Sequence, residues 1–195
     1  MQVRVSKRAR RARIVVHPTR KVEVVVPQGT SRRSIERLVE EHREWVERRL
    51  AQLEPVLGLD RPGVVWVGGE ARPAPIGVDV GRWYRREARR RIGAVAAWEG
   101  ARLDLRPRSL AIRDQRTRWG SCSTSGALSF NWRLVLAPAP VLRYVVVHEL
   151  CHLREPNHSH SFWRLVAEAM PGFEPERAWL RRHGHELLAY RPQVE

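Results

Sequence analysis

The residues that decide the fold are His148-Glu149-Leu150-Cys151-His152, inside the apolar segment 141–154. Residues four apart lie on the same face of an α-helix, so both imidazoles can reach one metal ion. Glu149 lies one step round the helix, where it can accept a proton from water bound to that ion. The segment therefore predicts the metal-binding helix of a hydrolase.

A third ligand follows in His158, ten residues after His148. Pro156 prevents the helix from continuing to it, and Asn157 tolerates the left-handed conformation that a return turn uses. A shuffled chain of this composition would hold the first five-residue pattern in about 3% of cases, and the pattern with the third His in about 0.1%. We therefore expect one Zn²⁺ per chain on His148, His152 and His158, with a fourth position open to water.

Two features of this metal site stay open in the sequence. His160 is the alternative third ligand, because it lies only two residues beyond His158. Iron or cobalt can occupy the same imidazoles as zinc. The choice of zinc follows from the type of ligand alone.

The rest of the chain is typical of an α+β protein, in which the His148 helix packs on a small, mainly antiparallel sheet. We predict one domain over 1–195, with a hairpin and helix at 1–56, a linking region with an Arg-rich helix at 57–110, and the metal-binding core at 111–195. The expected elements are strands 13–17 and 22–26 with a break at Pro18, a helix from Ser31 to Leu53, a strand at 64–67, a loop at 72–75, a helix at 82–98 ending near Gly100, a hairpin at 118–136, the helix 141–154, and short helices from about Ser159 and Pro175.

The charge is the strongest compositional feature, since 36 basic residues oppose 21 acidic ones and leave a net charge of +15. Such a surface attracts polyanions, so nucleic acid is a candidate partner. The alternative is that an arginine-rich composition places Arg wherever a solvated cation suffices.

Several classes of protein are excluded or disfavoured by the composition. No run approaches the ~20 apolar residues of a membrane-spanning helix, so no membrane partner is expected. Cys122 and Cys151 are too few for a disulfide framework, and the segment after the basic N-terminus is too short for a signal peptide. We expect a cytoplasmic protein, and the oligomeric state is left open.

The motifs together resemble the YgjP-like metallopeptidase family, and the resemblance extends over nearly the whole chain. It rests on 148–153, Asn157-His158-Ser159, Phe162-Trp163, 118–123 and 131–134. The resemblance implies a zincin-like fold, distantly related to SprT-like proteins. It also implies that His148, His152 and His158 bind zinc and that Glu149 is the catalytic base.

The expected reaction is hydrolysis of a peptide or protein substrate. Glu149 takes a proton from the zinc-bound water and passes it to the leaving amine. An extended substrate would lie along the predicted edge strand 118–123. The candidates for stabilising the oxyanion are Arg118, Asn131 and His160, although each of them also has a structural interpretation.

Two other functions remain open at this point. The same site could hydrolyse a phosphate ester or a nucleotide, with the phosphates held by a strand carrying Arg113, Arg116 and Arg118. Alternatively, the chain is a basic, nucleic-acid-associated binding protein whose zinc is structural. Three ligands and an open fourth position favour a catalytic metal over a structural one.

Overall fold

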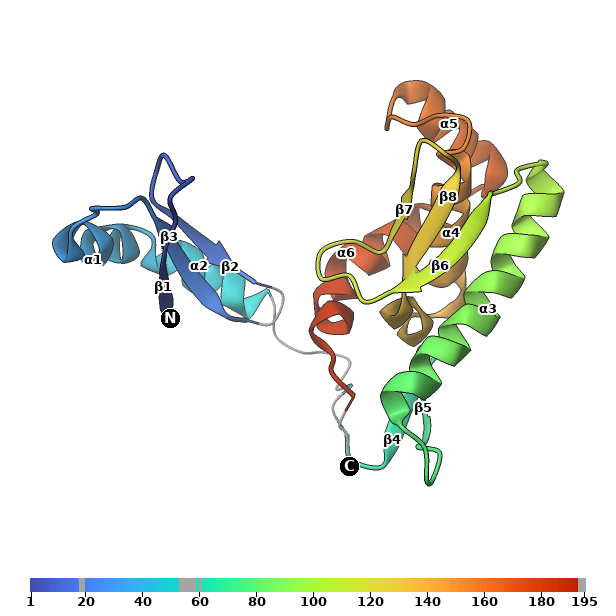
Figure 1. Cartoon of the computed structure of the whole chain (residues 1–195), viewed down its shortest axis with the longest axis horizontal. Coiled ribbons are helices and arrows are strands. Elements are labelled where there is room, and N and C mark those ends of the chain that lie inside the picture. Colours follow the sequence, from blue (N-terminus) through green and yellow to red (C-terminus); the bar gives the residue numbers. More distant parts are fainter. Residues whose placement is uncertain (18–19, 53–58, 60, 193–195) are drawn as a thin grey trace. The chain divides into compact units, whose positions relative to one another are not determined.

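The computed structural model describes residues 1–17, 20–52, 59 and 61–192 (Figure 1). The predicted break at Pro18 and the predicted end of the first helix at Leu53 lie outside these residues. The chain forms two compact units, Met1–Leu57 and Gly58–Glu195, and each is described by itself. The single domain over 1–195 stays a prediction.

The N-terminal unit is built on a three-stranded sheet in the order β1-β3-β2. The hairpin of β2 (Arg13–Val16) and β3 (Val22–Val26) is antiparallel, which confirms the prediction for these strands. An additional strand, β1 (Gln2–Val5), pairs in parallel with β3. Val24, Val25 and Val26 are buried, so the central strand carries the core of this small unit.

Two helices follow the sheet, α1 (Arg32–Glu41) and α2 (Arg43–Ala51). Ser31 caps α1 as predicted, since its side chain accepts a hydrogen bond from the Ser34 amide. The prediction of one continuous helix is wrong, because the chain breaks at His42. The His42 ring Nδ1 lies 3.0 Å from the Leu38 carbonyl oxygen. The ring thus takes the place of a backbone amide as the hydrogen-bond partner of this carbonyl, and α1 ends here.

The second unit begins with a hairpin of β4 (Val64–Val67) and β5 (Glu70–Pro73). Gly68 and Gly69 both have positive φ, at 69° and 84°. Positive φ at both residues gives a two-residue turn that matches the right-handed twist of the two strands. The predicted loop at 72–75 is wrong for its first two residues, because Arg72 and Pro73 pair with β4.

The Arg-rich helix α3 (Val80–Leu103) begins at the cap Asp79 and continues past Gly100, where the sequence predicted its end. Gly100 has a packing role instead, since a Cβ there would lie 2.7 Å from the Leu105 carbonyl oxygen. The helix ends at Asp104, which adopts the left-handed conformation (φ 50°).

A second three-stranded sheet has the order β6-β8-β7 and consists of β6 (Ser109–Arg113), β7 (Gly120–Cys122) and β8 (Ala127–Asn131). The hairpin of β7 and β8 is antiparallel as predicted, and β6 adds to it in parallel, so the sheet is mixed. Arg116 and Arg118 lie in the loop between β6 and β7, so the predicted strand carrying them together with Arg113 is wrong.

The strand predicted to reach Leu136 stops at Asn131, where a short 3₁₀-helix, Trp132–Leu136, begins. The Asn131 side chain accepts a hydrogen bond from the Arg133 amide and so caps this helix. The prediction of strand beyond Asn131 is therefore wrong.

Three helices complete the unit, namely α4 (Ala139–Cys151), α5 (His160–Ala169) and α6 (Glu174–Ala189). α4 contacts α3, α5, α6 and β7, which makes it the central helix of an α+β fold packed on a small sheet (Figure 1). The fully buried Glu99 of α3 binds Arg143 of α4 and Arg102, fixing α4 against α3. No helix within the described ranges has the length and hydropathy to cross a membrane.

Candidate metal centre

Three histidines converge where α4 ends. His148 and His152 stand one turn apart, and the turn after Cys151 brings His158 back to them. The Nε2 atom of His158 lies 3.0 Å from that of His148 and 3.2 Å from that of His152. In a tetrahedral site with Zn–N bonds of about 2.0–2.1 Å, two nitrogens lie about 3.4 Å apart. The donor type and the spacing therefore fit one zinc ion.

His152 is oriented by a second contact. Its ring Nδ1 lies 2.9 Å from the Glu155 carbonyl oxygen, and a hydrogen bond there places the proton on Nδ1. The Nε2 lone pair is then free to face the other two histidines. A backbone carbonyl commonly orients a metal-binding histidine in this way.

The surroundings also favour the neutral form of two of the histidines, His148 and His158. Burial lowers the pKa of His148 to about 3, and the neighbouring His152 and His158 lower it further. Partial burial and the charge of His152 lower the pKa of His158 as well. Because a metal binds the neutral imidazole, these groups are ready for coordination at neutral pH without losing a proton.

An aromatic wall from α5 holds the three rings. Phe162 is fully buried, and its ring centroid lies 4.9 Å from that of His148, 4.3 Å from His152 and 4.8 Å from His158. Trp163 packs beside it against His148 and His158. The predicted helix start is confirmed, since Ser159 accepts a hydrogen bond from the Phe162 amide.

Glu149 lies beside the cluster with only 7% of its surface exposed. Burial raises the pKa of its carboxyl to about 7, and the charge of Arg118 opposes this shift. No hydrogen-bond donor within the described residues binds the carboxylate. A buried, unpaired carboxylate with this pKa is suited to take up and release a proton near neutral pH.

Gly120 of β7 makes room for this carboxylate. A Cβ at position 120 would lie 2.5 Å from Glu149 Cγ and 2.6 Å from its Oε1. Both distances are well inside van der Waals contact, so any side chain at 120 would displace Glu149. Gly120 is therefore a positioning residue for the carboxylate.

Replacing Gly120 with Ala is expected to lower turnover at least about 100-fold, because even a 1 Å displacement of a catalytic group has effects of this size. Bound metal should stay unchanged, since the three atoms nearest to a Cβ at 120 all belong to Glu149 and not to a histidine. The matched control is Gly93→Ala on α3, where a Cβ would meet no atom within 4 Å. Equal loss of bound metal and of turnover in Gly120→Ala would contradict the positioning role.

The histidines and Glu149 open into a pocket of about 440 Å³. β7 forms one side of it, and β7 is an edge strand of its sheet. The other residues that line it are Arg118, Trp119, Tyr144, Val145, Pro156 and Leu180. The pocket thus joins a metal-binding cluster, a carboxylate and an unpaired strand edge.

The three candidates for the oxyanion lie in different places. Arg118 lines the pocket. Asn131 is fully buried, and its amide donates to the carbonyls of Gln115 and Arg118, so it supports the loop before β7. His160 is exposed at the start of α5 and lies outside the cluster of three histidines.

Two further residues at the site escaped the sequence analysis. Tyr144 lies one helical turn before His148, and its spacing on the predicted helix could have revealed it. Arg177 of α6 lies over the Trp163 ring at 4.1 Å, and its charge helps to lower the pKa of His148. Nothing in the local sequence indicates this role of Arg177.

The sequence model of the YgjP-like metallopeptidase domain matches residues 10–73 and 60–183. The chain belongs to the YgjP-like metallopeptidase family. The resemblance noted in the sequence is thereby confirmed. The YgjP-like domain makes this chain a metal-dependent hydrolase, and the three histidines form a group able to hold the metal ion.

Two known proteins are similar to parts of this YgjP-like chain. A UTP pyrophosphatase of Escherichia coli (strain K12) is 42% identical over 48 residues, which cover 23% of this chain and 29% of that protein. The crystal structure of the metallopeptidase zymogen of Pyrococcus abyssi abylysin aligns with a TM-score of 0.43 and 23% identity, covering 53% of this chain and 99% of that one. The match thus spans less than a third of the curated relative.

Proposed function

We propose that this YgjP-like chain is a zinc-dependent peptidase whose ligands are His148, His152 and His158 and whose general base is Glu149. The observation that carries the proposal is the edge strand β7 beside the histidines and Glu149. An extended peptide can pair with such an edge through backbone hydrogen bonds, which brings its carbonyl groups past the metal centre.

In the proposed reaction, zinc would supply a Lewis acid that polarises the scissile carbonyl and makes water more acidic. Glu149 removes a proton from the attacking water, whose oxygen bonds to the carbonyl carbon. The C–N bond then breaks, and Glu149 returns the proton to the leaving amine. Its pKa of about 7 matches both steps, since the group must accept and donate a proton in one cycle.

Arg118 is the candidate that best fits the developing oxyanion. Among the three residues considered, it alone lines the pocket, and its charge reaches Glu149. A cation beside the scissile carbonyl would stabilise the negative charge that builds up on its oxygen. Asn131 is proposed as a support for this loop, because its own hydrogen bonds are already made.

A second candidate function is hydrolysis of a phosphoanhydride in a nucleoside triphosphate. It is favoured by the similarity to a UTP pyrophosphatase and by the positive charges of Arg118 and Arg177 near the site. The same ligands and the same base would then direct water to phosphorus. Both candidates fit a cytoplasmic protein, in which Cys122 and Cys151 are free thiols.

The experiment that separates the two candidates uses the zinc-loaded full chain and a Glu149→Gln preparation made in parallel. One arm follows cleavage of casein and a mixed peptide library by mass spectrometry, and the other follows release of pyrophosphate or phosphate from UTP and ATP. Peptide cleavage that disappears in the variant supports the peptidase. Nucleotide hydrolysis without peptide cleavage overturns it in favour of the second candidate.

A further inference from the structure

The N-terminal unit carries a strongly basic segment that the metal centre does not use. Residues 6–13 read Ser-Lys-Arg-Ala-Arg-Arg-Ala-Arg, with five cations and no carboxylate. We call this segment the basic loop. It follows β1, crosses the carboxyl end of β3 and ends at Arg13, the first residue of β2 (Figure 1).

Backbone contacts hold the basic loop on the sheet. The Ser6 amide donates to the Val26 carbonyl at 2.9 Å, and the Ala9 amide donates to the Ser6 carbonyl at 3.2 Å. Ala9 and Ala12 are half-buried, whereas all five cationic side chains are exposed. The loop thus turns its small residues inward and its charges outward.

The loop and the adjacent strand also form a concave surface of about 420 Å³. Every residue that lines it is either an arginine or a small residue, namely Arg4, Ser6, Arg8, Ala9, Arg10, Arg11 and Arg13. A hollow lined by guanidinium groups fits an anion, since each group can donate two parallel hydrogen bonds to phosphate oxygens.

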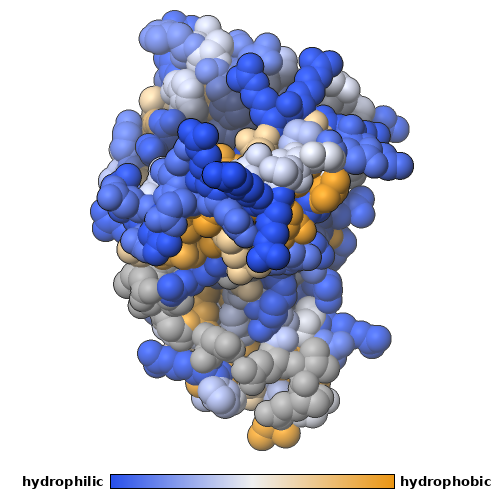
Figure 2. Space-filling view, turned by 90° about the vertical axis from the view of Figure 1, so that its left-hand side faces the viewer, coloured by the Kyte–Doolittle hydropathy of each residue, from blue (hydrophilic) through white to orange (hydrophobic). Residues whose placement is uncertain are grey.

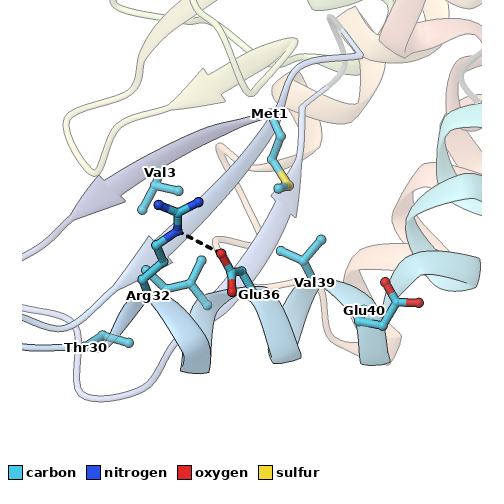
Figure 3. Close-up of a pocket in the computed structure, with 8 residues that line it drawn as sticks. Met1, Val3, Thr30, Arg32, Glu36, Val39 and Glu40 are labelled. Carbon is cyan, nitrogen blue, oxygen red and sulfur yellow. Dashed lines mark hydrogen bonds and ion pairs between the residues drawn. The ribbon is translucent and has the colours of Figure 1, made fainter.

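Four of the six arginines of α1 and α2, in the same unit, are paired with a carboxylate. Each of four ion pairs there joins an arginine to a nearby glutamate, as in Arg32–Glu36 at 2.8 Å (Figure 3), and the others are Arg37–Glu41, Arg43–Glu40 and Arg48–Glu44. The side of the chain drawn in Figure 2 is mainly hydrophilic, with small hydrophobic areas between the charged residues.

The five cations of the basic loop have no ion pair with any residue that the structure describes. Arg4, just before the loop, is paired with Glu23 at 3.0 Å. An arginine-rich composition would affect the helices and the loop alike, so it does not explain why four of the six helix arginines have a carboxylate partner and none of the loop cations has one among the described residues. Residues 6–13 therefore concentrate five cations in one short segment with no carboxylate partner among the described residues.

We propose that the basic loop binds the phosphodiester backbone of a nucleic acid. Five cations over eight residues extend beyond one phosphate group, so a chain of phosphates can pair with them simultaneously. Contacts to phosphates carry no sequence information, so we expect binding to be independent of sequence. Its only apolar side chains are two alanines, which gives it no residue to insert into a lipid bilayer.

The test measures binding of the full chain to fluorescein-labelled duplex DNA, single-stranded DNA and single-stranded RNA of about 20 nucleotides, by anisotropy at several salt concentrations. With four to five phosphates engaged, log K should fall against log [salt] with a slope of about −4 for the duplex. The three arms show which nucleic acid is preferred.

The decisive variant replaces Arg8, Arg10, Arg11 and Arg13 with Gln. We expect it to bind at least about 100-fold more weakly near 0.1 M salt, with a slope smaller by about 3. The control removes the same number of arginines from the helices, through Arg32, Arg37, Arg43 and Arg48 to Gln, each of which is paired with a glutamate, and should bind within about threefold of the parent. A double charge reversal, Arg10→Glu with Arg11→Glu, should abolish binding by itself.

Three results would overturn the proposal. They are equal losses in the loop variant and the helix control, a slope near zero, and binding to vesicles of anionic lipid but to none of the three nucleic acids. Bound zinc and the melting temperature are measured for each variant. Bound zinc reports on the metal centre, and the melting temperature reports on the fold. Failure of the peptidase assignment is therefore distinguishable from failure of the nucleic-acid proposal.

Discussion

Glu149→Gln is expected to lower turnover at least about 10³-fold while one zinc ion stays bound per chain. The amide keeps the size of the side chain, so the contact with Gly120 and the packing of α4 survive. It removes the group that accepts the proton from water, and a buried carboxylate with a pKa of about 7 has no nearby substitute. The measurement is turnover on whichever substrate the comparison of peptides with UTP and ATP identifies, with zinc determined by plasma mass spectrometry.

Glu155→Gln is the matched control for that change. Glu155 lies six residues further along, and only its backbone carbonyl serves the site. The same acid-to-amide exchange there should leave turnover within about twofold, as for an ordinary surface substitution. Full activity of Glu149→Gln would contradict the assignment of the base, and equal losses in both variants would attribute the effect to charge near the site.

His158→Ala is expected to weaken zinc binding by about 100- to 1,000-fold. Zinc held by four protein ligands is bound by about 10–16 kcal/mol, so one ligand contributes about 2.5–4 kcal/mol. His158 forms two of the close nitrogen contacts in the cluster, at 3.0 and 3.2 Å, and its loss leaves two ligands on one helix face. Competition with a chromophoric chelator gives the affinity directly.

His160→Ala is the control for the third ligand. His160 is exposed at the first position of α5, outside the cluster, so zinc should be retained at the affinity of the parent chain. Loss of zinc from His160→Ala, with retention in His158→Ala, would reverse the order of the two candidates. Both variants keep the Ser159 cap, so the start of α5 is not disturbed.

The metal cluster was accessible from sequence because helical spacing, a proline and one further histidine define it locally. The ends of helices and strands were harder to predict where a side chain competes with the backbone for a hydrogen bond, as at His42 and Asn131. Gly100 was predicted to end its helix because glycine is common just after the last residue of a helix. The structure gives another reason for the glycine, since the Leu105 carbonyl oxygen lies too close to position 100 for any side chain.

The parts of the site that depend on tertiary contacts were beyond the sequence. Gly120 and Glu149 lie 29 positions apart, and no local pattern indicates that one makes room for the other. Arg177 reaches the histidines from α6 in the same way. Tyr144 is the exception, since the period of α4 places it on the metal-facing side.

The contact between His152 and the Glu155 carbonyl has a consequence for how this site tolerates change. Every amino acid supplies a main-chain carbonyl, so no substitution at 155 deletes the group that orients the ring. The orientation depends instead on the path of the turn, and Pro156 narrows that path by restricting the residue before it. The residue type at 155 can therefore change without loss of this contact, because the backbone geometry of the turn maintains it.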